Sequence, residues 1–334
     1  MTYSTTLTRG SGPTYSSTPG VHPLIPEDVS ASIIKNTTNQ SAVLTLFPKR
    51  NMTTAQQRMP VLASKPSAFF VTGDIGLKQT TGMSWANKFL DAEEIAVIVP
   101  VAEKILDDTK YDIWGEIKPE IEEAIGIVLD AAVLFGYNKP STWPASIVVA
   151  ALAAGSTVTQ GAGVDVAADI NSVMAAVEAD GYDVTGFFMR NSMKAQLRGL
   201  RDTTNGFIFL PDRSGLTDTV YKGTIYGEKA VTSMSGIFEA EDAGTYGRAS
   251  NSIKLIAGSW KHGLMGVRQD VTWKMLDQAV INDADGNIVF NLPQQDMVAL
   301  RVVCRYAWQV PNPINRMSPT ESTRYPFAVL RDPS

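Results

Sequence analysis

A chain of 334 residues is long enough for two domains, each with an apolar core of its own. With 44% apolar and 19% charged residues, a formal net charge of −5 and one cysteine, the sequence describes a globular protein and excludes a general nucleic-acid binder, a disulfide framework and a cysteine-rich metal site. The amino-terminal MTYSTTLTRGSG lacks the apolar region of a signal peptide, and the longest apolar run, residues 145–154, is too short to cross a bilayer, so we expect a soluble chain made in a cytoplasm, without a membrane anchor.

Residues 1 to about 30 form a segment rich in Ser, Thr, Gly and Pro with few apolar side chains. Such a segment cannot order itself, because it buries too little apolar surface to offset roughly 1–2 kcal/mol of backbone entropy per residue. We therefore predict an arm that a neighbouring subunit holds in place; an arm folded back on its own domain is the alternative. Within residues 25–47 we expect a short helix, followed by a strand in AVLTLF at residues 42–47.

The next stretch, residues 48–91, is long, polar and poor in apolar side chains. The sequence AFFV at residues 68–71 predicts the end of a strand, TGDIG at residues 72–76 predicts a turn, and LKQTTGMSW at residues 77–85 predicts the returning strand. An isolated two-stranded hairpin is marginally stable in water. We therefore expect this hairpin to pack against something beyond its own domain; an edge hairpin lying on the body is the alternative.

The longest helical pattern runs through residues 111–136, after a predicted buried strand at residues 93–101. Apolar side chains recur every three or four positions, at Ile113, Ile117, Ile121, Ala124, Val128, Ala131 and Phe135. This period predicts one buried helix face and places the acidic residues on other faces, namely Glu116, Glu120, Glu123 and Asp130. Asp112 is the expected N-cap and Gly136 the expected C′ residue, while Pro119 predicts a kink or a late helix start.

Beyond Pro144 the pattern alternates between helix and strand. We predict a helix over residues 169–180 with Asp169 as its N-cap, a buried strand over residues 184–189, and a further helix that begins after Asn191. This alternation is typical of a small α/β domain.

From Ile253 onward the chain is again rich in predicted strands, with a hairpin turn in DADGN at residues 283–287 and an irregular tail after Pro311. Alternation of apolar and polar side chains in these strands predicts one buried face. Cys304 lies in such an apolar run, so we expect a buried thiol that fills space.

The sequence carries no catalytic signature. Its two histidines are His22, in the polar arm, and His262, and no G-x-S-x-G motif accompanies them. The DADGN stretch resembles the first half of a calcium loop, but Gln294 stands where that loop has its bidentate Glu. A GAG sequence at residues 161–163 is too short for a dinucleotide fingerprint. We predict no catalytic, cofactor-binding or metal-binding residue; a hydrolase that uses His262, or a carboxylate-based enzyme, is the alternative.

Three stretches, in this order, resemble the major capsid proteins of tailed bacteriophages with the Hong Kong 97-type fold. The first is EEIAVIVPVAEKILDDT from residue 93 together with the helix that follows it, which is similar to that family's P-domain strand and spine helix. The second is IAGSW at residues 256–260 with GVR at residues 266–268, and the third is FNLPQQDMVALRVVCRY from residue 290. The likeness covers most of the chain.

This resemblance implies an α+β fold divided into an N-terminal arm (1–45), an extended E-loop hairpin (46–91), a P-domain with a strand and the spine helix (92–145), an A-domain (146–249), and a return to the P-domain with a carboxy-terminal tail (250–334). Some relatives join a Lys of the E-loop to an Asn near the end of the P-domain through an isopeptide bond. The corresponding regions here hold Lys65, Lys78, Asn312 and Asn315, but no motif selects a pair, so we expect no crosslink.

The resemblance also implies a structural, non-enzymatic role. Copies of the chain would tile an icosahedral virion capsid in pentamers and hexamers, assembled in the host cytoplasm around double-stranded DNA that is held without sequence-specific binding. The amino-terminal arm is short and polar, so scaffolding would come from a separate protein or none, and portal and decoration proteins are further expected partners. An encapsulin-like nanocompartment shell protein is the nearest alternative, although its family has a cargo-binding amino-terminal helix that this Ser/Thr/Gly/Pro arm disfavours.

Overall fold

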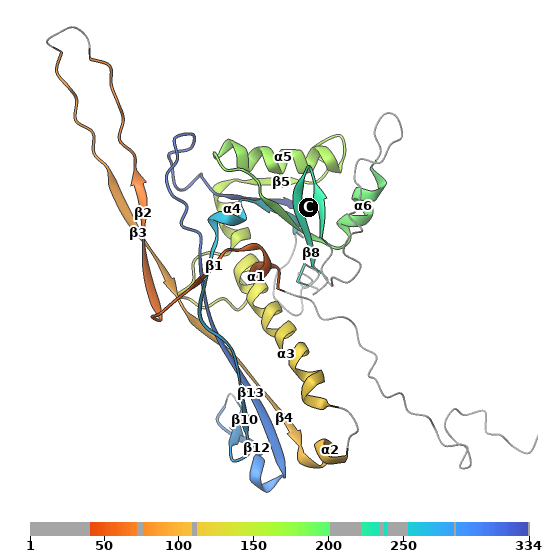
Figure 1. Cartoon of the computed structure of the whole chain (residues 1–334). Coiled ribbons are helices and arrows are strands. Elements are labelled where there is room, and N and C mark those ends of the chain that lie inside the picture. The colour runs from red at the N-terminus through yellow and green to blue at the C-terminus, as the bar shows by residue number, and fades with distance from the viewer. Residues whose placement is uncertain are drawn as a thin grey trace, which may run out of the picture.

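The computed structural model describes residues 41–71, 76–108, 112–200, 222–233, 237–238, 253–283 and 285–332 (Figure 1). Two larger sheets, a long helix and a projecting two-stranded hairpin make up most of this described part. The predicted amino-terminal arm, with His22, and most of the predicted turn at residues 72–76 lie outside the described residues. No helix of the described ranges is both long and apolar enough to span a membrane.

A four-stranded sheet has its long strands in the lower half of Figure 1, in the order β1 (Lys49–Asn51), β10 (Leu264–Leu276), β13 (Met297–Gln309) and β4 (Glu93–Ala102). β13 pairs antiparallel with both β10 and β4, and β1 runs parallel to β10. The strand predicted at residues 93–101 is β4, but it is not buried on both faces. Ile95 and Val97 pack against the core, whereas Ile98 is 41% exposed, because the core covers only one face of the sheet.

Small elements lie at the lower end of this sheet: α2 (Glu103–Asp108), β11 (Val280–Asn282), β12 (Ile288–Asn291) and the 3₁₀ turn η4 (Leu292–Gln294). β11 and β12 pair antiparallel, so the hairpin predicted around DADGN is confirmed. The Asp283 Oδ1 atom accepts hydrogen bonds from the N–H groups of Asp285 and Asn287, at 3.0 and 2.8 Å. The carboxylate therefore stabilises the turn itself.

The long helix is confirmed as α3 (Ile113–Asp130). The Asp112 side chain accepts a hydrogen bond from the Gly115 N–H at 3.0 Å, so Asp112 is the N-cap, as predicted. A late start at Pro119 is wrong, since the helix begins six residues earlier and continues through the proline. The proline ring faces the carbonyl of the residue four positions back, and that residue is Gly115, which has no side chain to add to the crowding.

The buried face of the helix overlaps the predicted one only in part: Ile121, Ala131 and Phe135 are buried as predicted, whereas Ala124 is exposed. Its fully buried residues are Ile121, Ile125, Gly126, Leu129 and Asp130. Val128, which the predicted stripe included, is 48% exposed. The helix then widens into one π-helical turn, η1 (Ala131–Phe135), whose five side chains are all buried, and ends as predicted at Gly136, which has a φ of 82°.

Residues 42–46 form a short helix, α1 (Ala42–Leu46), where a strand was predicted. The buried carboxylate of Asp130 accepts hydrogen bonds from Ser41 Oγ at 2.5 Å and from the N–H groups of Ala42 and Val43 at 2.8 and 3.1 Å. The first N–H groups of a helix lack partners within the helix, so this distant carboxylate supplies them. Burial raises the pKa of Asp130 to about 6, against the lowering effect of these hydrogen bonds.

The second sheet has six strands, in the order β5 (Thr157–Thr159), β14 (Phe327–Arg331), β9 (Ile253–Gly258), β6 (Gly186–Arg190), β8 (Glu228–Ser233) and β7 (Lys222–Ile225). It is mixed, since β5–β14 and β6–β8 are parallel pairs and the others antiparallel. β9 and β14 come from residues that the predicted division assigned to the P-domain return and tail. The tail is therefore not irregular throughout, because its FAVL sequence is buried as a strand within this sheet.

Helices α4 (Ile147–Ala154), α5 (Val166–Ala179) and α6 (Met193–Gly199) accompany the six-stranded sheet. Asp165, and not Asp169, is the N-cap of α5, accepting a hydrogen bond from Ala168 N–H at 2.8 Å. Asp169 is buried in the first turn and accepts hydrogen bonds from the N–H groups of Gly161 and Gly163, at 2.8 and 2.7 Å. The backbone N–H groups of the two glycines in the GAG sequence are therefore bonded to a side chain of the same fold.

One core joins the two sheets. Side chains on one face of the six-stranded sheet belong to the same cluster as α3, η1 and the four-stranded sheet, while those on its other face pack with α5. The ring of Trp260, in the 3₁₀ turn η3 (Trp260–His262), lies 5.3 Å from Phe47 and 5.2 Å from Phe327. Residues far apart in the sequence thus meet at the junction of the sheets.

The predicted hairpin is present as β2 (Gln56–Ser64) and β3 (Ser84–Asp91), an antiparallel pair that projects from the body at the upper left of Figure 1. Its strands are paired only near the body. Residues 65–71 and 76–83 carry no regular ladder, although sequence patterns predicted strand at residues 68–71 and 77–85. The hairpin is therefore anchored at one end and has long, unladdered arms at the other.

Candidate subunit interface

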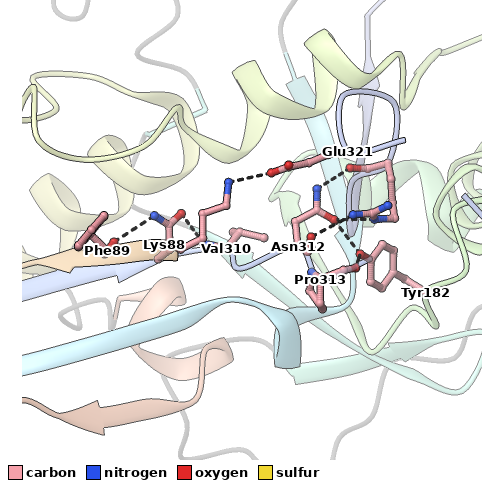
Figure 2. Close-up of polar contacts among 9 residues, drawn as sticks. Lys88, Phe89, Tyr182, Val310, Asn312, Pro313 and Glu321 are labelled. Carbon is pink, nitrogen blue, oxygen red and sulfur yellow. Dashed lines mark hydrogen bonds and ion pairs between the residues drawn. The ribbon is translucent and has the colours of Figure 1, made fainter. Parts of the chain in front are cut away.

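The base of the hairpin is fixed to the body by contacts with the end of β13 and the segment that follows it (Figure 2). Lys88 Nζ lies 2.8 Å from Glu321 Oε1, and the carbonyl of Phe89 accepts a hydrogen bond from Gln309 Nε2 at 3.1 Å. Three further contacts join the hairpin to the body: Trp143 Nε1, from the loop before α4, to the Asp91 carbonyl at 3.0 Å, the Ile314 N–H to the Leu62 carbonyl at 3.1 Å, and an Arg316 guanidinium nitrogen to the Pro66 carbonyl at 3.1 Å. These contacts set the direction in which the hairpin leaves the body.

A buried polar network holds the segment against which the hairpin rests (Figure 2). Asn312 Oδ1 accepts hydrogen bonds from Tyr182 Oη at 2.8 Å and from Arg324 Nε at 3.1 Å, and Asn312 Nδ2 donates to the Arg324 carbonyl at 2.8 Å. The Asn315 amide is also engaged, donating to the Asp180 carbonyl and accepting from the Ser318 N–H. Both asparagines that the sequence offered for a crosslink therefore have structural hydrogen bonds within their own chain.

One face of the hairpin packs inward and the other is open. Met59, Val61 and Leu90 are buried against the body. On the opposite face, Leu62 pairs with Trp85, and Trp85 is 62% exposed. Toward the tip Phe69, Phe70, Val71, Leu77 and Met83 are also exposed, and Phe70, at 104%, and Leu77, at 92%, are the most exposed of them.

These exposed apolar side chains are gathered on one projecting element. Contiguous apolar patches of more than a few hundred Å² are rare on soluble proteins, and they mark interaction surfaces. The described hairpin residues beyond the ladder also contain two lysines, Lys65 and Lys78, and no carboxylate. The open face and tip of the hairpin therefore form our candidate subunit interface.

The alternative enzymatic site does not assemble around His262. Its Nδ1 atom lies 3.0 Å from Ser259 Oγ, and its ring lies edge-on to Tyr182 at 4.9 Å. Ser259 is fully buried, so its hydroxyl has no access to a substrate. Partial burial and the nearby Lys261 lower the pKa of His262, which favours the neutral ring in this turn. The contact between His262 and Ser259 stabilises a 3₁₀ turn. The Ser259 hydroxyl is not a nucleophile exposed in a cleft.

The other candidate nucleophile and metal ligands do not form a site among the described residues either. Cys304 is buried, as predicted, and burial raises the pKa of its thiol to about 11. No group of three His, Cys, Asp or Glu side chains in the described ranges is placed to hold a metal ion. Gln294, at the position that a calcium loop reserves for glutamate, accepts a hydrogen bond from Asn291 Nδ2 at 2.7 Å.

The family model described as the phage capsid family matches residues 22–314, which is most of the chain. The chain belongs to the phage capsid family. It is 24% identical over 291 residues to the major capsid protein of Staphylococcus phage 80alpha, a match that covers 85% of this chain and 80% of that protein.

Solved structures agree with this assignment. A chain from Microbacterium phage Oxtober96 is 38% identical, with a TM-score of 0.77 and coverage of 93% of this chain and 97% of that one. A chain from Mycobacterium phage Adephagia is 30% identical, with the same TM-score and coverage of 93% and 96%. The protein is thus a major capsid protein of a tailed phage with a mixed helix-and-strand fold, and its place is the virion capsid.

The residues that anchor the hairpin of this capsid protein were not found from the sequence. Lys88 and Glu321 are 233 positions apart, and Gln309 and Phe89 are 220 apart, so no local pattern links them. The exposed tip did leave a signal, since AFFV is an apolar cluster in an otherwise polar stretch. We interpreted that cluster as the end of a strand, although its physical meaning is an uncovered surface.

Proposed function

We propose that this capsid protein self-assembles into a closed icosahedral shell around double-stranded DNA, and that the hairpin makes the contact that ties copies together. The observation that carries the proposal is the exposure of Phe70 and Leu77 on an element anchored at its base. Neither side chain is covered by the described part of its own chain. A second copy of the chain is the simplest partner to bury these side chains, because capsid proteins act as multimers and obligate interfaces commonly bury 2,000–5,000 Å².

We further propose that the chain has the Hong Kong 97-type arrangement. In it, residues 1–45 are the N-terminal arm and residues 46–91 the E-loop. The P-domain would consist of residues 92–145 and the four-stranded sheet, with α3 as the spine helix. The A-domain would consist of residues 146–249 together with β9 and β14, because these strands complete the six-stranded sheet. The separate sheets and the projecting hairpin support this division.

In this proposal the chain is a structural protein without enzymatic activity. Copies assemble as pentamers and hexamers in the host cytoplasm, with separate scaffolding, portal and decoration proteins as further partners. Many weak contacts per copy make the closed shell slow to dissociate. A net charge of −5 is compatible with a wall that holds DNA without sequence-specific binding, since strong binding requires many cationic contacts to phosphate.

The size of the purified full-length chain under native conditions tests this proposal. Electron microscopy and light scattering should show closed shells of megadalton mass, and a monomer at high concentration would contradict it. Nucleic acid recovered from shells made in infected cells distinguishes a DNA container from an encapsulin-like compartment, which holds a protein cargo. Hydrolase activity that disappears on substitution of His262 would favour the enzymatic alternative, which the burial of Ser259 disfavours.

A further inference from the structure

Polar contacts hold the hairpin at two places along its length. At the base, the Phe89 carbonyl accepts a hydrogen bond from the end of β13 at 3.1 Å. Farther out, the carbonyls of Leu62 and Pro66 accept hydrogen bonds, both at 3.1 Å, from residues 312–325, which we call the brace loop. Phe89 pairs with Arg58, and Leu62 lies four residues beyond Arg58 on β2, so the two places are about 13 Å apart at about 3.3 Å per residue. One attachment would let the hairpin pivot, whereas two fix its direction.

The brace loop keeps its shape through hydrogen bonds of its own (Figure 2). The Arg324 side chain is 2% exposed, and its Nε and Nη2 atoms donate to Asn312 Oδ1 and to the Asn312 carbonyl, both at 3.1 Å. Its Nη1 atom donates to the Ser318 carbonyl at 2.6 Å. A guanidinium is planar and holds its donors in a fixed fork. Both ends of the loop and its middle are therefore tied to one side chain, as in a compact Ω-loop, so we expect the loop to move as one piece.

The position of the brace loop is set by the six-stranded sheet and its helix α5. Asp180, the C-cap of α5, bonds to the loop twice: its carboxylate accepts from the Tyr325 N–H at 3.0 Å, and its carbonyl accepts from Asn315 Nδ2 at 2.5 Å. A Cβ at Gly181, the next residue, would lie 3.0 Å from Asn315 Nδ2, so the loop packs closely on this turn. After Tyr325 the chain enters β14 of the same sheet.

The strands of the hairpin continue instead into the four-stranded sheet, because β2 follows β1 and β3 leads directly into β4. The hairpin is thus joined to one sheet through its own chain and to the other through the brace loop. A change in the angle between the two sheets would therefore turn the hairpin.

We propose that the brace loop transmits the position of the six-stranded sheet to the hairpin, with Asp180 as the positioning residue, and so sets the angle at which successive copies join. The inference rests on the proposed self-assembly and names what determines its geometry. The extended chain from Leu62 to Phe70 spans roughly 26 Å, so a rotation of about 10° at the brace loop moves the far end by about 5 Å. The rotation between successive copies decides whether a repeated contact closes.

Distances between two spin labels in the dissociated full-length chain test the transmission. The labels are placed at Ala63→Cys on the hairpin and Ala175→Cys on α5, both exposed positions, while the native Cys304 is buried with a raised pKa and stays unlabelled. We expect a single narrow distance distribution. Arg316→Met combined with Glu321→Gln removes the side-chain contacts of the loop with the hairpin, and it should shift the mean or at least double the width.

A control variant changes the same charges elsewhere. Arg268→Met combined with Glu103→Gln lies at exposed positions of β10 and α2, outside the brace loop, and should leave the distribution unaltered. Equal distributions in the two double variants would overturn the inference.

Substitution of Asp180 tests whether the signal passes through the brace loop. In the described part of the chain, Asp180 bonds to the loop and not to the hairpin. Asp180→Ala should nevertheless broaden the distance distribution, and Asp180→Asn, which keeps a side-chain oxygen for the Tyr325 N–H, should restore most of it. A role in stability alone would lower the melting temperature and leave the distribution narrow, and that result would also overturn the inference. If Asp180→Ala does not fold, the loop double variant decides.

The diameter of assembled shells tests the consequence for assembly. Electron micrographs should show uniform shells from the unaltered chain and from the Arg268→Met and Glu103→Gln control. The Arg316→Met and Glu321→Gln variant should give shells of altered or mixed diameter. Uniform shells of unaltered diameter from this variant would contradict the claim that the brace loop sets the joining angle, and would leave the proposed function intact. Failure of the unaltered chain to form any shell would instead refute the proposed function.

Discussion

The long helix and the projecting hairpin are both elongated elements that carry large apolar side chains, but they bury those side chains in different ways. Leu129 and Ile125 of α3 are at most 5% exposed within a single chain, whereas Phe70 and Leu77 of the hairpin are more than 90% exposed. The helix is therefore stabilised by its own chain, and the hairpin tip has no such stabilisation. The comparison separates residues that determine folding from residues that we expect to determine assembly.

Removing helix burial should have the largest effect on folding. Leu129→Ala deletes a fully buried side chain, and such substitutions lower the free energy of unfolding by about 2–5 kcal/mol. Val128→Ala is the matched control, because Val128 is the preceding residue of the same helix and is 48% exposed. Denaturant unfolding of the dissociated chain measures both. Equal losses from the two variants would show that α3 does not bury the face described.

The buried Asp130, which binds the first residues of α1, should make the free energy of unfolding depend on pH. The folded chain raises the pKa of Asp130 from 3.8 to about 6, so it binds this proton more tightly than the unfolded chain does. The stabilisation that this tighter proton binding gives the folded chain is complete below about pH 4 and is lost as the pH rises through about 6. A shift of about two units corresponds to about 3 kcal/mol. Asp130→Asn should flatten the dependence of unfolding free energy on pH between 4 and 7, and Asp108→Asn, at an exposed position, should not. An unaltered slope in Asp130→Asn would contradict the assignment.

The ion pair at the hairpin base should contribute much less. Lys88 and Glu321 are 33% and 59% exposed, and exposed pairs are worth about 0–1 kcal/mol. Lys88→Met should therefore change the free energy of unfolding by less than about 1 kcal/mol. The same variant should increase hydrogen exchange in β3, because one of the contacts that hold the hairpin is gone. A loss of several kcal/mol would mean that the base belongs to the folding core.

Substitution at the tip should have the smallest effect on folding and a large effect on assembly. Phe70→Ser changes a fully exposed side chain, so the melting temperature of the dissociated chain should be unaltered, since such surface changes are usually within about 0.5 kcal/mol. Shell yield, measured by sedimentation, should fall sharply. Phe70→Leu, which keeps an apolar side chain, should restore much of it. A tip variant that assembles normally would remove the distinction between the two regions.

Local pattern predicted the elements whose determinants are local. The caps at Asp112 and Gly136, the turn at DADGN and the strand that contains Cys304 follow from sequence spacing and were found where expected. The helix α1 was missed because its N–H groups are satisfied by Asp130, 87 to 88 positions away. The same contact explains why an acidic residue expected on an outer face is buried.

Burial on a helix or sheet depends on what packs against it. The predicted stripe of α3 included Val128 and omitted Ile125 and Leu129, because the apolar side chains of this helix cover more than one face and only the packing partners select one. β14 was missed for the same reason, since FAVL becomes a strand only beside β9 and β5. The candidate interface was predicted in outline, as a hairpin without a core, but its anchoring residues come from a distant segment.

The most direct test compares hydrogen exchange of the hairpin in the assembled shell and in the dissociated chain. Amides of residues 65–71 and 76–83 lie outside the β2–β3 ladder, so the account predicts fast exchange in the free chain and strong protection in the shell, while α3 is protected in both. Equal exchange of these amides in the two states would contradict the claim that the hairpin tip is buried by a second copy.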